Sequence, residues 1–275
     1  MPLHHTSNPD GADLASRRRA PGRPRHDHSL RTDGLAGTAS ARFGEAFSPG
    51  PQHTEIPTVH LVTRRRLDDD AVCAVEAIMP GGLARNGGPA SCLLDPSGRY
   101  LRQIGAIGFQ WSGGPIAVTI PGADLLEGRV IGLVTVALLG SGLPAERLNL
   151  ILPEPALLDI DTDAVLGLSA LRDLGVGLCV DNFGAGVASL NLLRRLPLTG
   201  IKLARALVRG LPYDREDAAI ARAIISTAHA LDLTVVADGV DTERQRAFLA
   251  HCGCDEGQGA LFGAPLPIPA YTHDA

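Results

Sequence analysis

The chain has 275 residues, with 25 basic and 30 acidic side chains, so its formal net charge is −5. The hydrophobic fraction of 45% and the charged fraction of 20% are typical of a globular protein, and this charge balance excludes a chain that coats nucleic acid or an anionic membrane along its whole length. No apolar run reaches the roughly 20 residues that a membrane span needs, and an odd number of cysteines (five) is not a disulfide framework, so we expect a cytoplasmic protein.

Residues 1–55 differ in composition from the remainder of the chain. They are rich in Arg, Pro, Gly and His, and their apolar residues show no period. Such a segment cannot bury enough apolar surface to offset its conformational entropy, so we expect a disordered tail. Its basic cluster at residues 17–25 is diluted by acidic neighbours, and we expect no specific binding of nucleic acid there.

From residue 56 to residue 267, short apolar runs alternate with helical patterns. The apolar runs predict strands at 58–63, 71–79, 116–120, 148–152, 176–180, 200–203, 233–237 and 258–262. The helical patterns predict helices at 99–109, 124–140, 163–174, 189–195, 217–231 and 242–251. Continuous apolar strands are typical of a parallel sheet that is buried on both faces. This α/β alternation favours a (β/α)8 TIM-like barrel over an open doubly wound sheet, with a short C-terminal tail at 268–275.

Polar residues follow one another at the carboxyl ends of the predicted strands, where the chemistry of such barrels gathers. These residues are Glu76, Thr119, Glu154, Asp181, Asn182, Lys202, Asp238 and Gln258. Polar residues cap the strands of any barrel, but here we expect three carboxylates, Glu76, Asp181 and Asp238, to meet a lysine at one end. Mg2+ and Mn2+ bind oxygen ligands, and two-metal hydrolysis of a phosphodiester needs several carboxylates. The pattern therefore indicates a candidate metal-dependent site.

Several ordered motifs follow one another along the chain: VEAI at 75–78, RLNLILPEPAL at 147–157, DNFGAGVASL at 181–190, LRRLP at 193–197, IK at 201–202, VVADGVDT at 235–242 and GCDEGQGALFGAP at 253–265. Together they resemble the EAL family of phosphodiesterases, which open the bacterial second messenger cyclic di-GMP. The resemblance covers about residues 57–267. It implies an EAL-type TIM-like barrel with one antiparallel strand, and Mg2+ or Mn2+ as cofactor.

The resemblance also implies roles for individual residues. The family's metal ligands correspond to Glu76, Thr119, Ile151, Asp181, Asn182 and Asp238, and its catalytic positions to Glu76, Lys202 and Gln258. The family positions that support the substrate and the loop after Asp181 correspond to Glu154, Phe183 and Gly184. Lys202 is the only lysine in the chain, and it falls on the family lysine that orders the attacking water. Arg and Lys are not interchangeable in such a position, because Lys is a compact point charge.

The departures from the family concentrate at the metal positions. Ile151 replaces a glutamate and marks a lost ligand, and Asn182 replaces an aspartate, so two negative charges are missing. Thr119 is shorter than the family asparagine, and Asp238 is one methylene shorter than the family glutamate. The family arginine that contacts the ligand phosphate corresponds to Pro80.

Two functions remain open at this point. The first is a regulatory module: a degenerate EAL domain that binds cyclic di-GMP or a protein partner, with little or no hydrolysis of the dinucleotide. Such a domain would hold a single metal ion or none. The second is an active but weakened phosphodiesterase that depends on Mg2+ or Mn2+ and yields linear pGpG. We favour the first because Ile151 cannot bind a metal. A homodimer remains open, and we expect no specific nucleic acid and no membrane as partners.

Overall fold

The computed structural model describes residues 59–78, 99–111, 113–186 and 190–267. They belong to one compact unit, Pro49–Ala275. The tails predicted at 1–55 and 268–275, and Pro80, lie outside the described residues. None of the described helices combines the length and the apolar character that crossing a bilayer requires.

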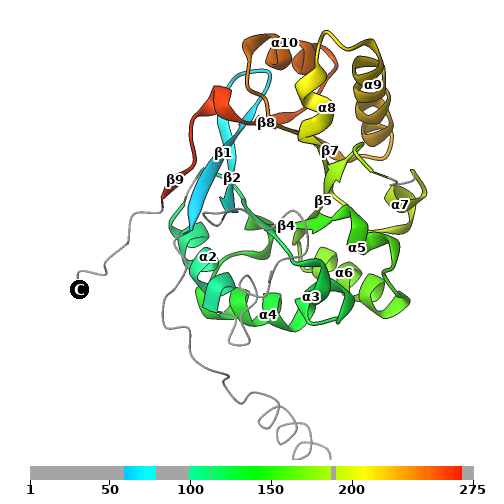
Figure 1. Cartoon of the computed structure of the whole chain (residues 1–275). Helices are drawn as coiled ribbons and strands as arrows, with labels where there is room; N and C mark the ends of the chain where they lie inside the picture. The colour runs from blue at the N-terminus through cyan, green and yellow to red at the C-terminus, as the bar shows by residue number, and fades with distance from the viewer. Residues whose placement is uncertain (1–58, 79–98, 112, 187–189, 268–275) are drawn as a thin grey trace, which may run out of the picture. The chain divides into compact units, whose positions relative to one another are not determined.

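Nine strands of the described residues form one sheet, in which β1 closes a ring of eight strands between β8 and β2, and β9 pairs with β1. The strands are β1 (His60–Arg66), β2 (Val72–Ile78), β3 (Ile116–Thr119), β4 (Leu148–Pro153), β5 (Gly177–Phe183), β6 (Gly200–Leu203), β7 (Thr234–Asp238), β8 (Glu256–Gln258) and β9 (Leu266–Pro267). Strands β2 to β8 pair in parallel with their neighbours, whereas β1 is antiparallel to both β2 and β8. Helices surround this ring (Figure 1). The predicted TIM-like barrel with one antiparallel strand is thereby confirmed.

The helices connect successive strands on the outside of the ring. They are α2 (Arg99–Gln110), α3 (Gly122–Leu126), α4 (Val130–Ser141), α5 (Glu154–Leu158), α6 (Thr162–Asp173), α7 (Leu190–Arg195), α8 (Arg205–Gly210), α9 (Arg215–His229) and α10 (Glu243–His251), with 3-10 turns η2 (Ala145–Arg147) and η3 (Ala260–Phe262). Three of these helices begin at a residue whose side chain caps the helix N-terminus. Asp161 caps α6, Asp214 caps α9, and Thr242 forms a capping box with Gln245 on α10.

Two predicted elements are wrong. The single helix expected at 124–140 is two helices, α3 and α4, because Gly128 between them has a left-handed φ of 66°. The strand expected at 258–262 ends at Gln258, and η3 follows it. Gly259 is the reason: its backbone lies so close to Val240 that a Cβ would stand 2.4 Å from the Val240 carbonyl oxygen, and there the chain leaves the sheet. The short elements α5, α8, η2 and β9 were not predicted, since none spans enough residues to show a period.

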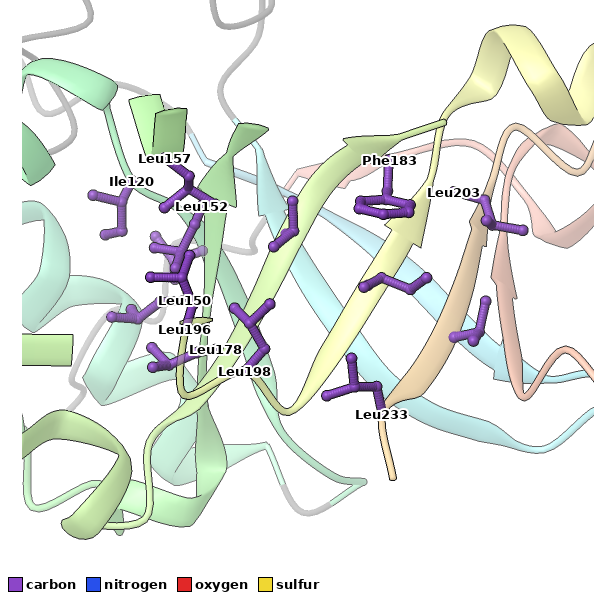
Figure 2. Close-up of a cluster of buried hydrophobic side chains, with 14 of the residues drawn as sticks. Ile120, Leu150, Leu152, Leu157, Leu178, Phe183, Leu196, Leu198, Leu203 and Leu233 are labelled. Atoms are coloured by element: carbon purple, nitrogen blue, oxygen red, sulfur yellow. The ribbon is translucent and has the colours of Figure 1, made fainter. Parts of the chain in front are cut away.

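Alternation along the strands separates the core from the candidate site. In β4, Leu150 and Leu152 point to one face and Ile151 to the other. Leu152 lies with Ile120 and Leu157 in the apolar layer between the strands and the helices (Figure 2). The opposite face of each strand points into the ring, so residues two apart on one strand line the barrel interior.

Candidate active site

The centre of the barrel interior is a buried ion pair between β2 and β6. Lys202 Nζ lies 3.0 Å from Glu76 Oε1 and 2.8 Å from Glu76 Oε2, and both side chains are only 5–6% exposed. The two residues are 126 positions apart in the chain. A buried charge is tolerated only when it is paired, and here each partner compensates the other.

The charges around this pair determine its ionisation. Burial by itself would raise the pKa of the Glu76 carboxyl, but Lys202 and Arg64 outweigh burial and hold that pKa below its ordinary value. Burial by itself would lower the pKa of Lys202, but Glu76, Asp238 and Asp181 raise it above its ordinary value. Lys202 therefore stays protonated at neutral pH, and it can donate hydrogen bonds or attract an anion but cannot act as a general base.

Asp181 and Asn182 follow at the carboxyl end of β5. Asp181 Oδ1 lies 3.8 Å from Lys202 Nζ. Burial raises the pKa of Asp181 above its ordinary value, although Lys202 opposes this shift. Asn182 is exposed, has a left-handed φ of 55°, and donates from Nδ2 to Asp181 Oδ2 at 3.3 Å. The amide of Asn182 thus serves the carboxylate before it as a hydrogen-bond donor.

Asp238 and Gln258 form the next pair along the ring. They are opposite each other in the register of β7 and β8, and Gln258 Nε2 donates to Asp238 Oδ1 at 3.1 Å. The side chain of Gln258 also helps to hold the pKa of Glu76 low. The structure therefore brings together Glu76, Asp181, Lys202, Asp238 and Gln258, as expected from their places at the strand ends.

Thr119 and Ile151 lie on β3 and β4, between β2 and β5 in the ring. They are opposite each other in the register of β3 and β4, and Ile151 is also opposite Cys179 of β5. Ile151 is completely buried. An apolar side chain thus stands on the inner face of β4, at the position where the sequence marks a lost metal ligand.

The residues expected to support the loop after Asp181 lie together at the end of β5. Phe183 is buried, and Gly184 has a left-handed φ of 93°. Glu154 is buried at the start of α5, and a Cβ built on Gly186 would stand 2.5 Å from its Oε1. This close approach places the Glu154 carboxylate directly against the loop.

Neighbouring side chains already engage the carboxylates of this group. Within the described residues, no three carboxylate, imidazole or thiol side chains lie close enough together to hold a metal ion. Both oxygens of Glu76 face Lys202, and Asp238 is held by Gln258. The arrangement does not fit a two-ion centre.

One charged residue of the interior was not predicted from the sequence. Arg64 of β1 is 2% exposed, and its guanidinium lies 3.5 Å from Glu76 and 3.5 Å from Glu256. Arg65 and Arg66, the next two residues, are instead partly exposed and pair with Asp70 and Asp69. Three consecutive arginines in a strand gave no signal for which side chain points inward.

The comparisons with known proteins agree with this architecture. The family model that matches is the EAL domain, over residues 91–265, so the chain belongs to the EAL family. The matched range begins after Glu76, so β1 and β2 lie outside it.

A curated relative is the cyclic di-GMP phosphodiesterase NbdA of Pseudomonas aeruginosa, 43% identical over 156 residues, or 56% of this chain and 20% of that protein. The bifunctional diguanylate cyclase/cyclic di-GMP phosphodiesterase MucR of the same species is 39% identical over 55% of this chain and 22% of its own length. The chain thus spans about a fifth of the length of these relatives.

Solved structures show the same fold. The P. aeruginosa MucR phosphodiesterase in complex with c-di-GMP superposes with a TM-score of 0.71 at 28% identity, covering 78% of this chain and 98% of that one. Klebsiella pneumoniae BlrP1 in its calcium/cy-diGMP complex superposes with a TM-score of 0.67 at 25% identity, covering 79% of this chain and 58% of that one.

Proposed function

We propose that this protein is a regulatory EAL domain of cyclic di-GMP signalling, which binds the dinucleotide or a protein partner. It hydrolyses the dinucleotide slowly or not at all. Family membership and the similarity to structures that hold c-di-GMP support the signalling role. Because the dinucleotide is a second messenger inside bacteria, the proposal places the protein in the cytoplasm. As binding partners of the protein we propose neither a specific nucleic acid nor a membrane. The proposal is compatible with a homodimer.

The observation that carries this proposal is the complete burial of Ile151 on the inner face of β4. Mg2+ and Mn2+ bind through oxygens, and a branched alkyl side chain offers none. Of the remaining carboxylates, Glu76 is already paired with Lys202, which leaves Asp181 and Asp238 as donors. Such a site holds a single ion or none, and two-metal hydrolysis needs both ions.

A second function is favoured by one specific observation. Lys202 is buried, remains protonated, and lies between Glu76 and Asp181 in the barrel interior, as a residue that orients a water or a phosphate oxygen must. On this reading the protein is a weakened phosphodiesterase, with Lys202, Glu76 and Gln258 as catalytic residues and Mg2+ or Mn2+ as cofactor. Glu154, Phe183 and Gly184 would position the loop that covers the substrate.

Titration with cyclic di-GMP separates the two functions. The full chain is titrated calorimetrically with and without Mn2+, and the products are then separated by chromatography. We expect saturable binding of the dinucleotide, or none, and no linear pGpG after hours of incubation. Turnover at a rate of order 1–10 per second, ordinary for an enzyme, would refute the regulatory reading.

A pair of substitutions tests whether the defect is local to the metal positions. Ile151→Glu and Asn182→Asp together should raise Mn2+-dependent turnover more than the two changes do separately, because both would serve one shared pair of ions. Asn191→Asp makes the same chemical change on the exposed face of α7 and should have no effect. A double variant that binds two Mn2+ ions and stays inactive would move the defect to dinucleotide binding.

A further inference from the structure

Arg64 differs from the other arginines of β1 in its surroundings. Its side chain is 2% exposed, while those of Arg65 and Arg66 are 31% and 51% exposed. A guanidinium remains charged under all conditions that proteins experience. A full positive charge is therefore enclosed inside the barrel, where it must be compensated by nearby anions.

Two carboxylates provide that compensation. Arg64 Nη2 lies 3.5 Å from Glu76 Oε2, and Arg64 Nη1 lies 3.5 Å from Glu256 Oε2. Both contacts are long, and Nε and Nη2 make no hydrogen bond to any described residue. The guanidinium therefore acts mainly through its charge.

Glu76 is consequently shared by two cations. Oε1 and Oε2 accept hydrogen bonds from Lys202, and Oε2 also faces Arg64. A divalent ion at this carboxylate would have to displace Lys202 or compete with both positive charges for one negative charge. Electrostatic repulsion between Arg64 and that ion would be only weakly screened, because the side chains of Arg64 and Glu76 are both buried.

We propose that Arg64 is a built-in cation that neutralises Glu76 in place of a divalent ion and thereby keeps the barrel interior poor in metal. This inference rests on the proposed function and names a residue that sustains it. Arg64 is a positioning residue, because it acts through Glu76.

The test is the affinity of the full chain for Mn2+, measured by calorimetry and by the rise of the melting temperature with Mn2+. Arg64→Met removes the charge and keeps a long, unbranched side chain. We expect this variant to bind Mn2+ at least tenfold more tightly than the natural chain, and its melting temperature to rise with Mn2+. Arg64→Lys keeps the charge and should retain weak binding, and Arg66→Met removes an exposed charge from the same strand and should change nothing.

A folded Arg64→Met variant with unchanged affinity for Mn2+ would overturn the inference, and so would a natural chain that already binds Mn2+ tightly. If Arg64→Met does not fold, Arg64→Gln, which keeps a hydrogen-bonding group, is measured against the same two outcomes. Hydrolysis of cyclic di-GMP is followed in the same samples. Turnover by the natural chain would contradict the proposed function, whereas the Mn2+ affinities alone decide the role of Arg64.

Discussion

Replacing Lys202 by methionine removes the ammonium group from the buried pair and keeps a side chain of similar length. Glu76 would then be left in the barrel interior at 6% exposure, with Arg64 at 3.5 Å as its remaining cation. Removing one partner of a buried ion pair typically costs about 3–5 kcal/mol of the free energy of unfolding. Because Arg64 remains, we expect the lower end, about 3 kcal/mol, which is a fall in melting temperature of roughly 6–12 °C for a chain of this size.

Urea denaturation of four proteins at pH 7 measures this effect: the natural chain, Lys202→Met, Glu76→Gln and the double variant. Each single change leaves a buried charge without its main partner, whereas the double change removes both charges. The double variant should therefore be more stable than the sum of the single effects implies, by about 2 kcal/mol of coupling. Arg205→Met breaks an exposed pair with Asp241 and should cost no more than about 1 kcal/mol.

The stability contribution of the pair should also depend on pH. The pKa of Glu76 is lower in the folded protein than its ordinary value of about 4.3. The pair therefore contributes fully above that ordinary value, and its contribution is lost as the pH falls through the lower folded-state pKa. The stability difference between the natural chain and Glu76→Gln should narrow below about pH 4. A Lys202→Met variant within about 0.5 kcal/mol of the natural chain, or strictly additive changes, would refute the reasoning.

A chain that begins at Glu55 should be soluble and melt cooperatively, since the composition changes there; aggregation of the shortened chain alone would show that the tail belongs to the fold. The basic cluster at 17–25 should shift DNA only without sequence preference and only at low salt, and a salt-resistant shift of one defined duplex would contradict this. Two buried cysteines, Cys179 and Cys254, should resist iodoacetamide at pH 8 and react after unfolding in urea. Burial raises the pKa of Cys179 to about 12, so only about one Cys179 thiol in 10,000 is ionised at pH 8. Labelling of the native protein at the rate of an exposed thiol would contradict this prediction.

The sequence alone was sufficient for the larger features of the fold. Apolar runs separated by helical patterns predicted α9 and β6 within two residues of their bounds, because burial on both faces of a parallel strand leaves a continuous apolar stretch. The sequence alone was insufficient where the backbone conformation of a single residue decides where a helix or strand ends. Gly128 divides one apolar stretch into two helices, and Gly259 ends β8, and neither effect shows in the pattern of apolar residues.

The candidate site divides in the same way. Residues at strand ends, among them Asp181, Lys202 and Asp238, could be listed from the chain, because parallel strands bring their carboxyl ends to one side of a barrel. The loss of a carboxylate at Ile151 stays a prediction, because it follows from the resemblance to the EAL family and not from the residue itself. What the sequence by itself determined about this protein is therefore the type of barrel and the set of groups offered at its interior.

Only the tertiary structure decided which of these groups are partners. Glu76 and Lys202 are 126 positions apart, and their direct contact depends on closure of the ring through β1. The pairing of β1 with β2 shifts register between Arg64 and Arg65, so that Arg64 is buried while Arg66, two residues on at the strand end, is half-exposed, although the local sequence treats them alike. The physical reason is that charge compensation in a closed barrel acts across strands, between residues whose proximity depends on register and closure and is not encoded in any one segment.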